Sequence, residues 1–101
     1  MDKEAQRKLY ALKRRIGAQE HEVETRLRAL DNAERRLSEL QDNKAVLLEV
    51  KFSGNENVYQ LELLKSKMDV DAARSHLRQD EQMLELYRRQ LEGMGGGEEA
   101  R

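Results

Sequence analysis

Residues 46–68, VLLEVKFSGNENVYQLELLKSKM, decide the fold, because two apolar runs flank the only strong turn signal before the C-terminal glycines. Ser53 and Gly54 are residue types that tolerate a left-handed backbone or hydrogen-bond it locally, so a helix can end at either of them. Asn57 is a good N-cap, and Gln60 follows three residues later, where a capping-box side chain reaches back. The chain is therefore predicted to double back at this point.

On both sides of the turn, apolar residues recur every seven positions, which is typical of a coiled coil. Before the turn, the two seam ladders are Leu9, Ile16, Val23, Leu30 and Leu37, and Leu12, Ala33, Leu40 and Leu47. After the turn, they are Leu63, Val70, Leu77, Leu84 and Leu91, with Tyr59, Ala73 and Tyr87 at the second position. A helix of about 50 residues does not stand alone in water, so the two segments are expected to pair.

The predicted fold is all-α, a long antiparallel two-helix coiled-coil hairpin over residues 1–92. We expect one helix over 2–52, a turn over 53–57 and a second helix over 58–92. The glycine-rich segment 93–101 is predicted to be a flexible tail, because its glycines end the helix. At 101 residues the chain is at most one domain.

The numbering also predicts a register for the pair, since facing residues lie at equal distances from the turn. With the turn centred at Asn55, Leu40 faces Val70 and Val23 faces Tyr87. Apolar layers then concentrate near the turn and thin toward the chain ends.

A second interpretation of the turn region is a short β-hairpin insertion. Val46, Leu48, Val50 and Phe52 alternate with other residues, as the side chains of a strand do. The heptad spacing that runs from Leu63 onward favours helix instead.

The segment around the turn carries more apolar residues than one seam can use. A helix that is apolar on all sides is buried on all sides, so this end is predicted to be an interface with copies of the chain or with another protein. The predicted interaction residues are Leu48, Val50, Phe52, Leu61, Leu64 and Met68.

Several functions are disfavoured by composition. The net charge is −1, the basic clusters are interspersed with acids, and no apolar run reaches the length of a membrane span, so neither nucleic-acid binding nor membrane insertion is expected. The chain has no cysteine and only two histidines, His21 and His76, without the paired carboxylates of a metal-binding bundle. We expect no catalytic site, no cofactor and no metal, and a cytoplasmic location.

Residues 42–61, DNKAVLLEVKFSGNENVYQL, resemble the end of the first helix and the first strand of β-type prefoldin subunits. The resemblance implies a strand over Val58, Tyr59, Gln60 and Leu61, subunits joined near the turn, and helix tips that hold unfolded client proteins. The family places glycine shortly after the aromatic residue to turn a β-hairpin, whereas this chain has Glu62 and Leu63. Its second helix is also usually longer.

The sequence therefore indicates a non-catalytic coiled-coil subunit or adaptor of a larger protein assembly. The most specific hypothesis is a prefoldin-like co-chaperone subunit that binds unfolded clients. The alternative is a structural or regulatory hairpin that docks on one folded partner, as stalk-like hairpins do.

Overall fold

The computed structural model describes residues 2–96. They form α1 (Lys3–Asp42), α2 (Lys44–Val50), α3 (Glu56–Leu91) and a π-helical turn, η1 (Glu92–Gly96). The chain divides into two units, a terminal unit of Met1–Thr25 with Leu77–Arg101 and a turn unit of Arg26–His76. Each unit contains a segment of α1 and a segment of α3.

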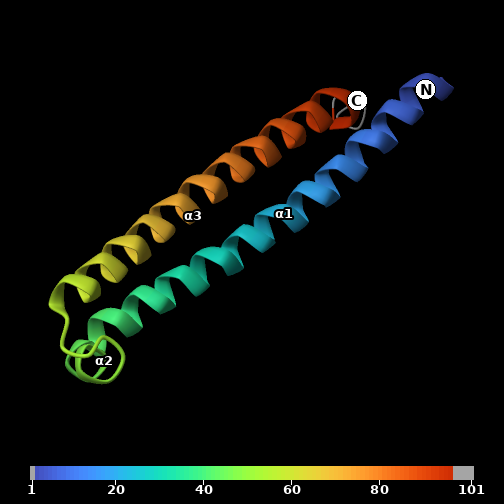
Figure 1. Cartoon of the computed structure of the whole chain (residues 1–101). Coiled ribbons are helices and arrows are strands. Elements are labelled where there is room, and N and C mark those ends of the chain that lie inside the picture. The colour runs from blue at the N-terminus through green and yellow to red at the C-terminus, as the bar shows by residue number, and fades with distance from the viewer. Residues whose placement is uncertain (1, 97–101) are drawn as a thin grey trace. The chain divides into compact units, whose positions relative to one another are not determined.

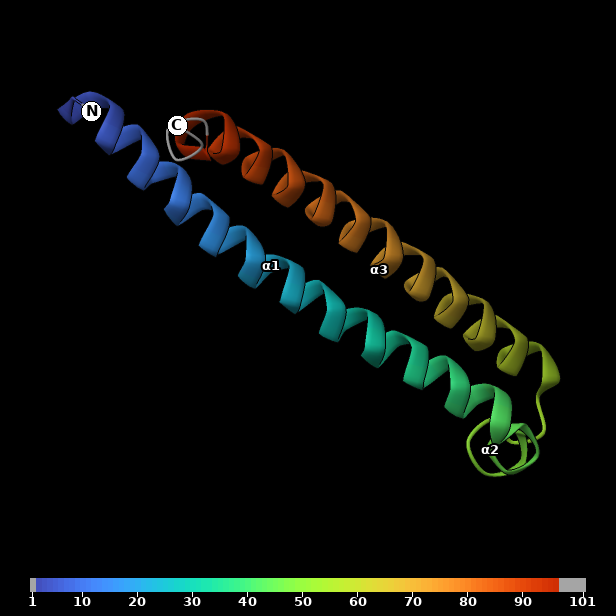
Figure 2. The same cartoon turned by 180° about the vertical axis from the view of Figure 1, so that it is seen from behind.

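The predicted all-α fold is confirmed. Within each unit the α1 segment and the α3 segment run side by side in opposite directions (Figure 1), and the view from behind shows the same pairing (Figure 2). The β-hairpin alternative is wrong, because residues 2–96 contain no strand. The strand that the prefoldin resemblance implies over 58–61 is likewise absent, since these residues belong to the first turns of α3.

Within α1 and α3 the predicted seam is confirmed, because every ladder residue of these two helices is buried or half-buried, whereas Leu47 is half-buried but lies in α2. In the terminal unit the centre of the core is formed by Leu12, Ile16 and Leu84, with Val23, Tyr87 and Leu91 packed against them. Full burial of one such side chain contributes roughly 1.5–3 kcal/mol. In the turn unit the buried residues are Ala33, Phe52, Tyr59, Ser66 and Val70.

The predicted register is wrong by one heptad. In the turn unit the Tyr59 hydroxyl donates a hydrogen bond to the Leu40 carbonyl oxygen at 2.7 Å. If Leu40 faced Val70, Tyr59 would lie about 16 Å away along the helix axis, at 1.5 Å per residue. In the terminal unit the Gln19 side chain donates to the Asp80 carbonyl at 3.0 Å, which requires the same shift. The cross-helix ion pairs Glu34–Arg74 and Glu20–Arg88 are offset from these hydrogen bonds in the opposite direction along the helices. The seam layer midway between the two sets places Leu40 level with Leu63.

The shift arises because the first helix does not run on to residue 52. It is interrupted at Asn43, which has φ −110° and ψ 24°. Asparagine is a weak helix former, so it is a suitable residue for such an interruption, although the Asn43 side chain makes no capping hydrogen bond to α2. After it, α2 is seen nearly end-on in Figures 1 and 2, while the turn-unit part of α1 is seen from the side. The last heptad of the predicted first helix thus belongs to the connection between the helices.

The turn itself has the backbone that its residue types suggest. Ser53 and Gly54 both have positive φ, 53° and 76° respectively. The N-cap of α3 is Asn55 and not Asn57, because the Asn55 side-chain oxygen accepts a hydrogen bond from the Val58 backbone N–H at 3.2 Å. This bond satisfies one of the four N–H groups that a helix start leaves unpaired.

At the other end, α3 ends at Leu91 and the π-helical turn η1 follows. The flexible tail predicted for 93–101 coincides in part with η1, and residues 97–101 lie outside the described residues. Among residues 2–96, no helix combines the length and the apolar character that crossing a membrane requires.

Candidate protein-interaction surface

Three of the six predicted interaction residues lie together on the outer face of α3 in the turn unit. Leu61, Leu64 and Met68 are 58%, 55% and 61% exposed. Their spacing of three and then four residues places them on one side of a helix. The buried residues Tyr59 and Val70 lie on the other side, in the seam. We call Leu61, Leu64 and Met68 the α3 stripe.

The other three predicted residues lie in or beside α2 and differ from one another. Val50 is 78% exposed, whereas Leu48 is half-buried. Phe52 is buried, so its assignment to an outward-facing surface is wrong. Its ring packs edge-on against the Tyr59 ring, with centroids 5.9 Å apart. Phe52 thus belongs to the core of the turn unit, where aromatic pairs of this geometry add to the energy of burial.

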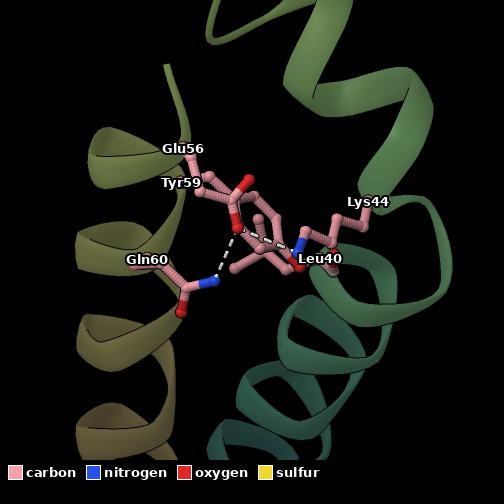
Figure 3. Close-up of polar contacts among 5 residues, drawn as sticks. All are labelled: Leu40, Lys44, Glu56, Tyr59 and Gln60. Carbon is pink, nitrogen blue, oxygen red and sulfur yellow. Dashed lines mark hydrogen bonds and ion pairs between the residues drawn. The ribbon is translucent and has the colours of Figure 1, made fainter. Parts of the chain in front are cut away.

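Tyr59 joins the start of α3 to the end of α1 (Figure 3). Its side chain is only 2% exposed, and its hydroxyl reaches the Leu40 carbonyl. The last four carbonyls of a helix have no partner within it, so a hydroxyl in this position satisfies one that α1 leaves open. The Lys44 ammonium lies 5.2 Å from the centre of the Tyr59 ring, a distance typical of a cation–π contact.

An ion pair spans the same connection. The Lys44 ammonium lies 2.9 Å from a Glu56 carboxylate oxygen, to which the Gln60 amide also donates at 3.0 Å (Figure 3). The hydrogen bond from Lys44, followed by that from Gln60, holds the pKa of Glu56 below its ordinary value. The same hydrogen bond to Glu56 raises the pKa of Lys44. Both groups are well solvated, so the pair orients the connection more than it stabilises it.

Three further large apolar residues of the turn unit are exposed although they were not among the six predicted, and one of them, Leu27, lies on α1. Val46 on α2 is exposed, and Val58, in the first turn of α3, is slightly exposed. Val58 precedes Leu61 by three residues and so extends the α3 stripe toward the turn. The spacing from Val58 through Leu61 would have predicted it, but its apparent place in a strand concealed that spacing.

The terminal unit has exposed apolar residues of its own. Met83 and Leu86 on α3 and Tyr10 on α1 are all exposed. These residues lie outside the heptad positions of the seam. The heptad pattern of the sequence therefore already predicts that they are exposed. They form no run of three at helical spacing comparable to the α3 stripe.

A groove lies between α1 and α3 in the turn unit. It has a volume of about 470 Å³, and Leu40 and Ser66 are among the residues that line it. Arg36 and Asp69 line it and also line a neighbouring groove of about 320 Å³, which includes Ala33. The residues that line the two grooves therefore carry charges of both signs. The α3 stripe is more apolar than either groove.

Residues 2–96 lack two kinds of polar feature, a cluster of metal ligands and a buried polar side chain without a hydrogen-bond partner. Over residues 2–96 no three histidine or acidic side chains come close enough together to hold a metal ion. Every buried side-chain nitrogen or oxygen in that part of the chain has a hydrogen-bond partner. What the turn unit presents is an exposed apolar stripe on a helix.

Comparisons with models of protein families, with curated proteins and with solved structures give no match for this chain. The resemblance to β-type prefoldin subunits therefore stays a prediction. The fold and the exposed apolar residues support a coiled-coil binding element.

Proposed function

We propose that this chain is a non-catalytic helical-hairpin subunit or adaptor that binds another protein through the α3 stripe. One observation carries the proposal: Leu61, Leu64 and Met68 are each more than half exposed on the face of α3 that lies away from the seam. Large apolar side chains gathered on one face of a helix are typical of a surface that another protein covers.

The hairpin does not need these residues for its own folding. The seam in the turn unit already contains Tyr59, Val70 and Ala33, all buried. Covering the α3 stripe would bury about half of each side chain's surface and contribute about 1 kcal/mol for each of its three residues. That gain is available only when a partner is present.

The prefoldin-like hypothesis is the narrower form of this proposal. It requires that the chain hold unfolded clients, which bind through many loosely defined contacts. A stripe at regular helical spacing supports docking on one folded partner more than it supports client holding. We therefore place the adaptor first and keep the co-chaperone as the second candidate, which the prefoldin resemblance implies.

The test replaces the α3 stripe without disturbing the seam. In the variant with Leu64→Glu and Met68→Glu, helicity by circular dichroism should be nearly unchanged. The matched control is Met83→Glu with Leu86→Glu, which alters the same two residue types at exposed positions of the terminal unit. A third variant, Val70→Glu, places a charge in the seam and should unfold the hairpin.

The readout is partner binding by tagged wild type and variants in extracts of the source cells. Proteins that are lost with the stripe variant but retained with the control are identified, purified and mixed with the chain, and the mass of the complex is measured in solution. Equal recovery by the stripe variant and the wild type would overturn the proposal. An assay of aggregation of an unfolded client separates the two candidates, because only the co-chaperone suppresses aggregation.

A further inference from the structure

The α3 stripe has one charge of each sign along each of its two borders. Lys65 and Asp69 lie four residues apart on one border, and Lys67 and Asp71 lie four residues apart on the other. All four residues are exposed. Met68 lies at the centre of this group, with both lysines before it and both aspartates after it. Turning the helix end for end therefore exchanges the positive and negative positions of each border.

These four residues form few ion pairs within the chain. The Lys65 ammonium lies 3.8 Å from a Glu62 carboxylate oxygen, in a pair whose lysine side chain is 72% exposed. Lys67, Asp69 and Asp71 make no ion pair with any residue of the described range 2–96. An exposed pair such as Lys65–Glu62 is readily exchanged for another, so all four charges are available to a molecule that covers the stripe.

A second copy of this chain, packed antiparallel with Met68 against Met68, brings unlike charges together. When a two-fold axis relates two antiparallel helices, each border faces the same border of the copy. Along the helix axis, Lys65 then lies about 3 Å from Asp69 of the copy, at 1.5 Å per residue. On the other border, Lys67 lies about 3 Å along the axis from Asp71 of the copy. The two-fold axis repeats both contacts, so four pairs of unlike charges flank the contact.

The same arrangement matches the apolar side chains by size. Leu64 lies level with Ala72 of the copy, and Leu61 lies level with Ser75. Ala72 and Ser75 are both exposed, so each large side chain of the stripe meets a small and accessible one. Methionine is flexible enough to fill the remaining space at the two-fold axis.

Other arrangements of two copies fit less well. A parallel pair in register sets one border against the other, so lysines meet lysines and aspartates meet aspartates. An antiparallel pair with Leu64 against Met68 brings Lys65 beside Lys65 of the copy. With Leu61 against Leu64, Met68 lies level with Asn57, so that part of the stripe meets a polar side chain. The antiparallel pair centred on Met68 is therefore favoured by both charge and apolar contact.

We propose that a second copy of this chain covers the α3 stripe, packed antiparallel about Met68 to form a homodimer. This inference rests on the proposed function, because it names the protein that the stripe binds. Three apolar side chains from each copy and exposed ion pairs form a small contact, which is typical of a weak and transient interface. Monomer and dimer are therefore expected to exchange, with a dissociation constant in the micromolar range.

The oligomeric state is measured by sedimentation equilibrium of the full chain, from micromolar to millimolar concentration. The dimer fraction should rise with concentration and fall as salt is raised, because exposed ion pairs are screened. The stripe variant, Leu64→Glu with Met68→Glu, should remain monomeric, whereas the control Met83→Glu with Leu86→Glu should dimerise as the wild type does. A wild-type chain that stays monomeric throughout this range would overturn the inference.

Cysteine crosslinking tests the arrangement, since the natural chain has no cysteine. Met68→Cys should form a disulfide between two copies under mild oxidation, because a disulfide requires Cα atoms within about 7 Å. Leu61→Cys is the matched control, since Leu61 is 58% exposed and Met68 is 61% exposed. It should stay reduced, because the two copies of Leu61 lie about 21 Å apart along the axis. Equal crosslinking of both variants would exclude the antiparallel pair.

Charge exchange tests the pairing along one border. Lys65→Asp should weaken the dimer about tenfold, because the two-fold axis repeats the new repulsion. Adding Asp69→Lys restores unlike charges on that border without changing the net charge of the wild type, and should recover the dimer. Circular dichroism verifies that both variants keep their helices. A double variant that dimerises no better than the single one would overturn the arrangement.

The failures of the two proposals differ. If the wild type is monomeric but its stripe still recovers other proteins from extracts, the inference is wrong and the proposed function stands. If the stripe variant dimerises as the wild type does and recovers the same proteins, both proposals are wrong.

Discussion

Tyr59 and Leu40 fix the two helices of the turn unit relative to each other, through a 2.7 Å hydrogen bond from a buried hydroxyl to a backbone carbonyl. A hydrophobic seam alone fixes the facing sides of two helices but only weakly their axial position, because each heptad offers a similar surface to the next. A directional bond to one carbonyl distinguishes between neighbouring heptads. Tyr59, which donates this bond, lies in the first turn of α3, directly after the connection.

The first prediction concerns this bond. Tyr59→Phe keeps the ring packed on Phe52 and removes only the hydroxyl, so it should destabilise the fold by about 1 kcal/mol. For a domain of this size, that loss lowers the melting temperature by about 4–8 °C. Thermal denaturation followed by circular dichroism measures it. A melting temperature equal to that of the wild type would show that the bond contributes nothing to stability.

The register predicts which cysteine pairs form a disulfide. A chain with Leu40→Cys and Leu63→Cys should crosslink under mild oxidation, because a disulfide requires Cα atoms within about 7 Å. The pair Leu40→Cys with Val70→Cys should remain reduced, since Val70 lies about 10 Å further along α3. The natural chain has no cysteine to compete. Non-reducing gel electrophoresis detects the crosslink. Crosslinking of only the second pair would contradict the register described above and support the one in which Leu40 faces Val70.

Two glycines predict opposite effects of the same substitution. Gly54→Ala should destabilise by about 1 kcal/mol, because Gly54 has a left-handed backbone with φ 76° that alanine adopts poorly. Gly17→Ala should stabilise by roughly 0.5–1 kcal/mol, because Gly17 lies within α1. A Cβ added at either position meets no atom within 4 Å, so packing does not enter. Urea denaturation of both variants provides the comparison, and two shifts of the same sign would contradict it.

The Lys44–Glu56 pair predicts a loss of stability at both extremes of pH. The pKa of Glu56 is lowered from 4.5, so its contribution is present above that value and is lost as acidification protonates it in the folded state. The pKa of Lys44 is raised from 10.5, so its contribution is present below that value and is lost at higher pH. Glu56→Gln should therefore make both limbs of the pH profile of the melting temperature slightly less steep, since the pair is exposed and is one of many titrating groups.

The control for this experiment is Glu49→Gln, which removes one exposed carboxylate from α2. That variant should keep the pH dependence of the wild type. A profile for Glu56→Gln that overlays the wild-type profile below pH 4.5 would exclude a role for the pair in acid stability.

The seam and the turn could be predicted from the sequence because each depends on local information. A repeat of seven in a helix of 3.6 residues per turn defines one face, whatever that face meets. Positive φ at Ser53 and Gly54 follows from what their residue types allow. The α3 stripe follows as well, since Leu61, Leu64 and Met68 are the apolar residues that the seam leaves over.

The register and Phe52 could not be predicted in the same way. A shift of seven residues maps the seam onto itself, so only the length of the connection decides between registers. That length depends on the interruption at Asn43, where a continuous helix and a broken one differ by little in local energy. Phe52 is buried because the connection then carries it back onto Tyr59.

Because α2 lies outside the paired helices, the chain should tolerate inserted residues better in α2 than in α1. No residue of α2 is buried, so extra residues spliced into it leave the packed layers of the turn unit where they are. Their entropic cost grows slowly, by about 0.6 kcal/mol for each doubling of the connection. One residue inserted within α1 has the opposite effect, because it rotates every later side chain by about 100° and turns the seam away from its partner. A reporter or a whole second domain is therefore best grafted into α2.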